Sequence, residues 1–487
     1  MIVDFRRKNR KILSFMLMGI IFLGGLLYFN KETNKPVLNE KKETINSYKM
    51  DVILEDESKR LMCNQNIQYV NNTKNELKSI YFHIYPNAFS KEEFAPFEKS
   101  QMKQAYPNGF NEGYINMQNI LIGGEKVKYN IEGNKEDILE IPLDKPLKQN
   151  ESVSIDMKFN VKLPNSVGRF GYGNDTINVT NWFPIACVYD DRGWNTKSYE
   201  CIGDPFYSDV SNFKVTLLAP SKYKFGNTGK VIESKSDDKK AMYNIEADKV
   251  RDFAFVLSDK FDIKKDHTKD TEILTYNLDK NYSDLSTTIA KDSIEIFSDM
   301  FGKYPYDTYS VIASDFYIGG MEYPTLSMID KSLYNSTNKF LLEYVIAHET
   351  AHQWWYSVVG NDEVNEPWLD EALTEYSTVL YFEKKYGKET SKKLIDTMEK
   401  QAKSYSSQDM FKPSSKYKNS MDYSLNVYTK GAVVFNTIRE EVGDKVFFKV
   451  LKEYYETYKF KNVNGSQFME LWRKNGVDID NIIKKCK

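Results

Sequence analysis

Residues 341–355 read LLEYVIAHETAHQWW, and this stretch decides how the rest of the sequence is interpreted. Residues 348–352, HETAH, are an instance of the pattern HExxH within a continuous helical pattern. On a helix, His348 and His352 project from one face at positions i and i+4, so both imidazoles can bind one Zn²⁺. Glu349 is then placed to act on a water at the metal. Because the chain has only four histidines, a chance match is improbable.

A catalytic zinc site needs a third protein ligand and an open position for water. We expect the first helix to cover residues 340–359 and a second to cover 367–382, where Pro367 stands just inside the start. The second helix offers the carboxylates Asp370, Glu371 and Glu375. Glu371 follows the second histidine by 19 residues. A turn between two antiparallel helices would bring it back to the same level as the two histidines. For Glu366 and Asp370 we expect surface or orienting positions. Glu375 either orients a ligand histidine or lies on the helix surface.

Two further motifs accompany this stretch. Residues 319–323 read GGMEY, with Glu322 lying 26 residues before the first histidine, and residues 428–431 read YTKG. Together with HETAHQWWYSVVGNDEVNEPWLDEALTEYS at residues 348–377, they resemble the aminopeptidase N family of zinc metallopeptidases, which are gluzincins. The resemblance covers roughly residues 47–487. It implies a β-rich amino-terminal domain followed by a thermolysin-like catalytic domain.

The resemblance also implies roles for particular residues. It assigns one Zn²⁺ per chain to His348, His352 and Glu371. It makes Glu349 the general base and Tyr428 the catalytic tyrosine, whose phenol stabilises the oxyanion. Tyr423, five residues earlier, resembles a second tyrosine of some relatives, and we expect it to serve packing.

The GGMEY stretch resembles the family's GAMEN exopeptidase motif, so Gly319, Gly320, Met321 and Glu322 are expected to bind substrate. A carboxylate at Glu322 would pair with the cationic α-amino group of a peptide that has a free N-terminus. The motif departs from the family at Gly320, which replaces Ala, and at Tyr323, which replaces Asn. The β-domain residue that assists amine binding is not located, and Asn181 is only a weak candidate.

The pattern of hydrophobic residues predicts an α+β chain of several domains. Between residues 47 and 262 it has period two, most clearly in VSIDMKFNVKL at residues 153–163, which predicts an antiparallel β-rich domain. From residue 263 to 487 helical patterns dominate, as in residues 284–301 and 430–442. This second part is the expected thermolysin-like, mostly helical catalytic domain.

The amino terminus has the pattern of a membrane signal. Residues 6–11, RRKNRK, precede 18 uncharged residues at positions 12–29. A helix of that length spans roughly 27 Å, near the thickness of a bilayer core, and the basic flank stays cytoplasmic. We therefore expect residues 1–30 to be a single-pass signal anchor and residues 31–46 a linker. The catalytic domain would then lie outside the cytoplasm, and cleavage followed by secretion is the alternative.

Composition excludes several other classes. Lys plus Arg is 67 and Asp plus Glu is 69, so the net charge of −2 gives no basis for nucleic-acid binding. Four cysteines exclude a disulfide-dense scaffold, and whether Cys187 and Cys201 pair stays open. The leading hypothesis is a zinc aminopeptidase. The alternatives are a thermolysin-type endopeptidase and a non-catalytic, zinc-containing surface protein that binds a partner.

Overall fold

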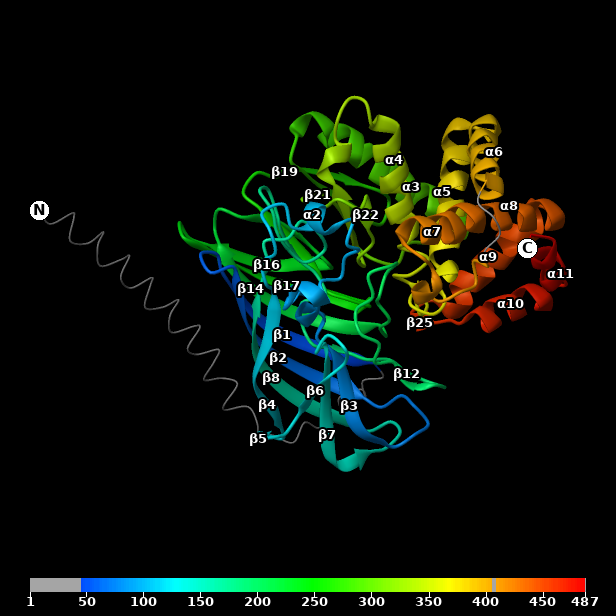
Figure 1. Cartoon of the computed structure of the whole chain (residues 1–487). Coiled ribbons are helices and arrows are strands. Elements are labelled where there is room, and N and C mark those ends of the chain that lie inside the picture. The colour runs from blue at the N-terminus through cyan, green and yellow to red at the C-terminus, as the bar shows by residue number, and fades with distance from the viewer. Residues whose placement is uncertain (1–44, 405–408, 487) are drawn as a thin grey trace, which may run out of the picture. The chain divides into compact units, whose positions relative to one another are not determined.

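The computed structural model describes residues 45–404 and 409–486 of the chain. Sheets dominate the first half of these residues. An eight-stranded sheet has the order β16-β17-β14-β1-β2-β8-β4-β5. Its strands are β1 (Asn46–Glu55), β2 (Arg60–Val70), β4 (Tyr114–Ile122), β5 (Glu125–Lys126), β8 (Ser152–Lys162), β14 (Ser211–Pro220), β16 (Lys230–Ser236) and β17 (Lys240–Val250). Most of them are long arrows in Figure 1, coloured from blue to green.

Two four-stranded sheets and a hairpin complete this β-rich half among the described residues. One sheet contains β9 (Gly171–Tyr172), β10 (Ile177–Val179), β15 (Lys224–Asn227) and β18 (Phe255–Ser258). The other contains β3 (Leu77–His83), β6 (Asn130–Glu132), β7 (Ile138–Leu147) and β11 (Ile185–Ala186). The hairpin pairs β12 (Tyr189–Asp190) with β13 (Gly193–Trp194).

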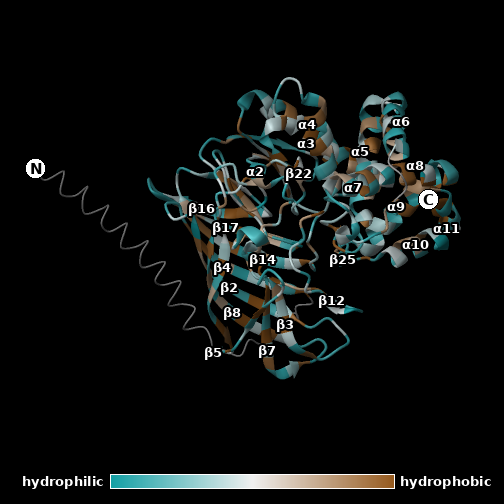
Figure 2. Cartoon of the chain, viewed as in Figure 1, coloured by the Kyte–Doolittle hydropathy of each residue, from teal (hydrophilic) through white to brown (hydrophobic). Residues whose placement is uncertain are grey.

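Alternation along the strands explains why these residues form sheets. In β8, Ile155, Met157 and Phe159 are buried on one face, as the period-two pattern predicts. Figure 2 shows brown and teal residues alternating along β2 and β8, which pair in antiparallel register. One detail of the prediction is wrong: β1 pairs with β14 in parallel, from Asn46 opposite Ser211 to Ile53 opposite Leu218. A parallel pair needs a long connection, and no local pattern signals it.

A five-stranded mixed sheet separates two hydrophobic cores. It has the order β19-β20-β21-β23-β22, with strands β19 (Asp262–His267), β20 (Glu272–Asn277), β21 (Thr308–Ser314), β22 (Gly320–Met321) and β23 (Leu326–Asp330). In β21 every residue is buried. Ile312 packs into the β-rich core, whereas Val311 and Ala313 pack into the helical core. Successive side chains point to opposite faces, so one strand serves both cores.

Helices make up most of the rest of the chain and lie together in Figure 1, from green to red. They are α3 (Ser283–Phe301), α4 (Lys339–Ala351), α5 (Glu371–Tyr386), α6 (Lys388–Ser404), α7 (Ser420–Ser424), α8 (Gly431–Val442), α9 (Asp444–Tyr458), α10 (Gly465–Lys474) and α11 (Ile479–Cys486). The β-rich first half and helical second half confirm the predicted architecture. The division at residues 262 and 263 stays a prediction, because the described residues from 45 onward pack as one compact unit.

The predicted helix over residues 340–359 is too long. Helix α4 ends at Ala351, and His352 caps it, its N–H still bonded to the carbonyl of His348 at 3.3 Å. Beyond it the backbone leaves the helix, since Tyr356 has a φ of 130°. The carbonyls of Tyr356 and Ser357 accept hydrogen bonds from the buried Arg251, at 2.7 and 3.2 Å, instead of helical N–H groups. The second predicted helix begins as a 3₁₀ turn at Pro367–Leu369, and α5 starts at Glu371.

One expectation concerns the amino terminus. The apolar stretch at residues 12–29 lies outside the described residues. Among the residues that are described, none of the helices combines the length and the apolar character needed to span a bilayer.

Cys187, which is buried, and Cys201, which is exposed, are both free thiols.

Candidate metal centre

Two helices bring the predicted zinc ligands together. His348 and His352 come from the end of α4, and Glu371 is the first residue of α5. The Oε2 atom of Glu371 lies 3.5 Å from Nε2 of His348 and 3.1 Å from Nε2 of His352. Zinc with bonds of about 2.0–2.1 Å in a tetrahedron separates its ligand atoms by about 3.3 Å. The three side chains therefore fit a single zinc ion.

The outer nitrogens of both histidines are held by acceptors. Nδ1 of His352 lies 3.0 Å from the carbonyl oxygen of Trp355, and Nδ1 of His348 lies 3.0 Å from Oε2 of Glu375. Such contacts fix the tautomer and turn Nε2 toward the metal. Glu375 is buried and also accepts a hydrogen bond of 2.5 Å from the phenol of Tyr344. Glu375 therefore lies beside a predicted ligand histidine and not on the helix surface.

The electrostatics of this group also suit a dication. Burial works to lower the pKa of His348, but its bonds to Glu371 and Glu375 outweigh burial and raise that pKa to about 10. For Glu371, burial is outweighed by the charge on His352, which holds its pKa well below the usual range. An anionic carboxylate that attracts protons to two imidazoles attracts a metal ion to the same place.

Glu349 lies against the backbone of strand β22. A Cβ atom added to Gly320 would stand 2.2 Å from Oε1 of Glu349, so a larger residue there would require the Glu349 side chain to move. Burial raises the pKa of Glu349 to about 8, against the positive charge of His348. Gly319, with a φ of 93° and no atom within 4 Å of an added Cβ, makes the turn into the strand. The two glycines thus serve different purposes.

Tyr428 lies on a π-helical segment, Leu425–Lys430, between α7 and α8. Such segments are rare and occur often at functional sites. Its ring stacks on His348 with centroids 5.6 Å apart, and its phenol donates a short hydrogen bond to Oε1 of Glu371. Burial raises the pKa of Tyr428 well above its ordinary value, so the phenol keeps its proton. Tyr423 is buried beside it at 5.8 Å, with a hydroxyl that has no partner among the described residues.

A cluster of buried carboxylates adjoins the ligands. Glu322 follows β22 directly, is 3% exposed, and its Oε1 has no hydrogen-bond partner among the described residues. A carboxylate oxygen of Asp204 lies within 4.8 Å of oxygens of Glu322 and Glu371. Burial raises the pKa of Asp204 to about 7, against the adjacent guanidinium of Arg169. Sequence reasoning missed Asp204, because nothing in CIGDPF at residues 201–206 signals a site 118 residues before Glu322.

Of the surface or orienting position expected for Asp370, the surface position is wrong. Asp370 is 1% exposed and, with Glu322 and His352, offers ligand atoms within 4.8 Å of one another. It accepts a hydrogen bond of 3.1 Å from Nδ2 of Asn361. It is buried because α5 packs against the rest of the helical core along its first three turns. Glu366 is half-buried, and both its oxygens accept from the N–H of Gly465 at 3.0 Å, which anchors the start of α10.

The unusual Tyr323 of GGMEY has a structural role. Its phenol donates to Oγ1 of Thr180 at 2.7 Å and to Oδ1 of Asn181 at 2.9 Å. Asn181 in turn donates to Asp252 at 2.6 Å. Both polar ends of the Asn181 amide are therefore occupied. The side chain that the sequence offered as a weak amine contact instead ties the motif to the β-rich half.

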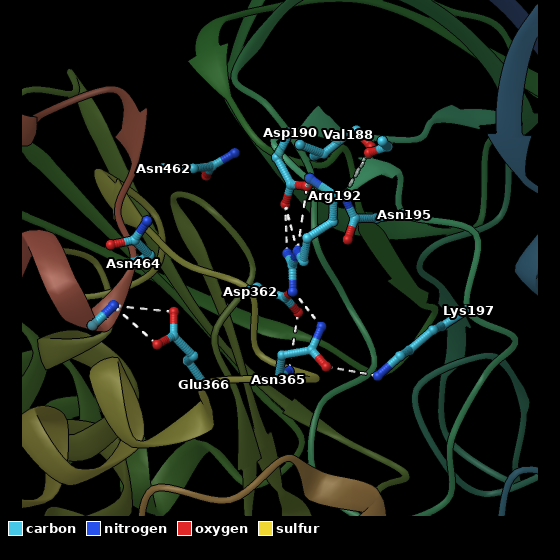
Figure 3. A network of polar contacts seen from close by, with 12 residues as sticks. Val188, Asp190, Arg192, Asn195, Lys197, Asp362, Asn365, Glu366, Asn462 and Asn464 are labelled. Atoms are coloured by element: carbon cyan, nitrogen blue, oxygen red, sulfur yellow. Dashed lines mark hydrogen bonds and ion pairs between the residues drawn. The ribbon is translucent and has the colours of Figure 1, made fainter.

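A cavity of about 740 Å³ lies away from the metal centre, between the β12–β13 hairpin and β25 (Lys461–Asn462). Within the described chain, the predicted site residues lie outside its lining. Figure 3 shows Arg192 between Asp190 and Asp362, and Lys197 reaching Asn365. Arg192 lies 2.6 Å from Asp362. This cavity is lined largely by polar residues of the β-rich and helical halves, and none of the candidate metal groups found among the described residues lies in it.

The fold and the site define a candidate metal centre of the HExxH type, with a glutamate placed where it could be the third ligand. Residues 285–485 match the family model described as Peptidase family M1 domain, so the chain carries an M1 peptidase domain. The family that the three motifs predicted is confirmed.

Curated relatives agree with this match. Tricorn protease-interacting factor F2 of Thermoplasma volcanium is 25% identical over 306 residues, which are 56% of this chain and 36% of that protein. Endoplasmic reticulum aminopeptidase 1 of Mus musculus is 27% identical over 238 residues, 45% of this chain and 25% of that protein. Aminopeptidase N of Lactococcus lactis is 27% identical over 209 residues, 40% of this chain and 24% of that protein. The chain thus spans only a quarter to about a third of these relatives.

A solved structure matches over nearly the whole length. The M1 zinc metallopeptidase from Deinococcus radiodurans has a TM-score of 0.66 at 14% identity, covering 93% of this chain and 96% of that one. At this identity the likeness establishes the fold, a β-rich domain followed by a helical domain. The neighbour is a zinc enzyme, and the described donor set fits one zinc ion per chain.

Proposed function

We propose that this protein is a zinc-dependent aminopeptidase that removes N-terminal residues from peptides. The observation that carries the proposal is Glu322, a buried carboxylate with an unpartnered oxygen beside the ligand set. A free α-amino group is cationic near neutral pH, and a carboxylate there would pair with it. The resemblance of the motifs and the names of the relatives support the same reading.

Glu349 is proposed as the general base. A bound zinc ion would supply a water acidified toward neutral pH and would polarise the substrate carbonyl. Glu349 would take a proton at its carboxylate and pass it to the leaving nitrogen. Its pKa of about 8 reflects burial without the ion, and the charge of a dication nearby would lower it.

Tyr428 is proposed to stabilise the oxyanion. Its phenol stays protonated and already points at the ligand group, where it donates to Glu371. During reaction this hydrogen bond would be exchanged for one to the developing negative charge. Removing one such donor lowers kcat by about 10²–10³-fold.

Glu322 would hold the substrate amine, with Asp204 as a second carboxylate within reach. The half-buried Arg169, whose guanidinium pairs with Asp204, limits the negative charge of this end of the site. An N-acetylated peptide has no ammonium to place there and would leave Glu322 unpaired. This difference accounts for a preference for free N-termini.

For the location we propose a single-pass anchor at residues 12–29, with the catalytic domain outside the cytoplasm. The support is the sequence alone, a basic flank followed by an apolar stretch. Fractionating cells that express the full chain tests it: an intact chain in the membrane pellet, released only by detergent, is expected. A shortened protein in the medium would instead indicate cleavage and secretion.

The decisive experiment compares free aminoacyl amides with their N-acetylated forms, using zinc-loaded protein and Glu349→Gln as the blank. Cleavage of the free amides alone is expected. Cleavage of the acetylated forms would make the protein an endopeptidase. No turnover of either form, in protein shown to hold zinc, would favour the partner-binding alternative.

A further inference from the structure

A second cavity opens directly beside the metal centre. Its volume is about 310 Å³, and Tyr428 and Asp204 both stand in its wall. Tyr428 stacks on His348, and Asp204 lies within 4.8 Å of oxygens of Glu322 and Glu371. Through Asp204 and Tyr428 the cavity therefore adjoins both the proposed amine anchor and the ligand set.

Six aromatic side chains from both halves of the chain line its walls, namely Phe89, Phe97, Tyr199, Tyr317, Tyr423 and Tyr428. Phe97 has its ring centroid 5.9 Å from that of Phe89 and 6.2 Å from that of Tyr317. On the other side Tyr423 packs edge-on to Tyr428 at 5.8 Å. Such surfaces favour apolar and, above all, aromatic ligands, which gain both burial and ring contacts.

The charge of the cavity is balanced internally. Among the described lining residues the charged ones are Arg169 and Asp204, and they form an ion pair with each other. A cationic side chain would find no unpaired carboxylate in these walls and would lie near a guanidinium. Burying it there would be unfavourable.

The mouth and floor are consistent with an apolar occupant. Ile318 lines the cavity and is 43% exposed, and Met421, next to the lining Ser420, is 63% exposed. At the floor, a Cβ on Gly203 would stand 2.9 Å from the ring of Tyr423. The loop that carries Asp204 can approach this ring only because position 203 is glycine.

We propose that this cavity binds the side chain of the substrate's N-terminal residue and selects large apolar or aromatic side chains over basic and small ones. The inference rests on the proposed aminopeptidase function, because it places the substrate amine at Glu322. Phe97 is its chief specificity residue, since its ring joins the walls contributed by the two halves.

Calorimetric binding to zinc-loaded Glu349→Gln protein tests the selectivity without relying on turnover. The ligands are the amides of Phe, Met, Lys and Ala, of which Met and Lys are similar in length. Phe and Met amides are expected to bind at least roughly tenfold more tightly than Lys and Ala amides, as one methylene alone can give that factor. Lys amide binding as tightly as Met amide would overturn the proposal.

A matched pair of variants locates the effect. Phe97→Ala should weaken Phe amide binding roughly tenfold or more and leave Ala amide binding unchanged. Phe94→Ala is the control, because Phe94 is also half-buried in this segment but lies over Lys91 rather than in the cavity wall. Equal effects of both variants would remove Phe97 from the role.

Turnover of the same amides by the native enzyme separates this proposal from the one it rests on. Selective binding without hydrolysis of any amide would contradict the aminopeptidase function and leave the cavity as an apolar binding site. Hydrolysis of all four amides with similar kcat/KM would contradict the selectivity and leave the aminopeptidase function standing.

Discussion

Gly320 has only a hydrogen atom in place of a side chain, and this leaves room for the carboxylate of Glu349, the proposed general base. Its backbone lies so close to Glu349 that any Cβ would displace the carboxylate. The neighbouring Gly319 has open space but a φ of 93°. Position 320 needs a glycine because another side chain approaches its backbone closely, whereas position 319 needs one because of its backbone conformation.

Substituting each glycine by alanine should therefore give different results. Gly320→Ala is expected to lower kcat by at least about tenfold, because displacing the base by about 1 Å is enough for larger losses. Gly319→Ala should lower stability by about 1–2 kcal/mol through its left-handed φ and leave kcat nearly unchanged. Steady-state kinetics and urea denaturation of both variants measure this. Equal kcat values for the two would contradict the assignment.

Glu375 is the residue that should control zinc affinity without touching the ion. Removing its carboxylate in Glu375→Ala frees Nδ1 of His348, and the loss of such a partner weakens metal binding by about 10–100-fold. Competition with a chromophoric chelator measures the zinc affinity. Glu389→Ala, an exposed glutamate on α6, should leave it unchanged. An unaltered affinity in Glu375→Ala would limit Glu375 to packing.

At the scale of elements, Arg251 joins the end of the β-rich half to the loop that follows the HExxH helix. Beyond Tyr356 and Ser357, its guanidinium donates to the carbonyls of Ser208, at 2.7 Å, and Lys461, at 2.8 Å. Gly360 is glycine because a Cβ there would stand 2.1 Å from the guanidinium carbon.

Arg251→Met should lower the free energy of unfolding by at least about 3 kcal/mol, because several buried carbonyls would lose their donor. Arg192→Met, which breaks a half-exposed ion pair with Asp362, should lower it by less than about 1 kcal/mol. Urea denaturation of both variants makes the comparison. Similar losses would show that the loop does not depend on Arg251.

His83, on β3, should make stability depend on pH. It is buried and stacked on Tyr85 at 4.6 Å, and burial lowers its pKa to about 4 from an ordinary 6.5. As the pH falls from 6.5 to 4, this imidazole takes up a proton in the unfolded chain but not in the folded chain. The free energy of unfolding therefore falls by about 3 kcal/mol over this range. Denaturation across that range in His83→Phe should lack this slope. His267→Asn, at an exposed position, should keep it.

Much of the site could be predicted because its chemistry is local in the sequence. The spacing of His348, His352 and Glu371 follows from helix geometry, and the alternation at residues 153–163 follows from strand geometry. The approach of Asp204 and the burial of Asp370 could not be predicted, since both depend on how distant elements pack. The end of α4 was missed for the same reason: Arg251, about a hundred residues earlier, binds the carbonyls that would have continued it.

For the whole molecule, we expect bound zinc to stabilise the folded chain by linking α4 to α5. With free zinc at about 1,000 times its Kd, the bound ion would raise the free energy of unfolding by about 4 kcal/mol. Chelation should lower the urea midpoint accordingly, and added zinc should restore it. Glu371→Ala should abolish most of this response. A midpoint that is insensitive to chelation in native protein would mean that the ion contributes nothing to folding.

The parallel pairing of β1 with β14 has a consequence during synthesis. Residue 211, where β14 begins, is made 158 positions after Ile53, the last paired residue of β1 (211 − 53). A ribosome working at about 5–20 residues per second needs roughly 8–30 s for that distance. Throughout this interval one edge of β1 presents unpaired N–H and C=O groups, on which other nascent chains can add strands. We expect the growing chain to be most prone to aggregation during this interval.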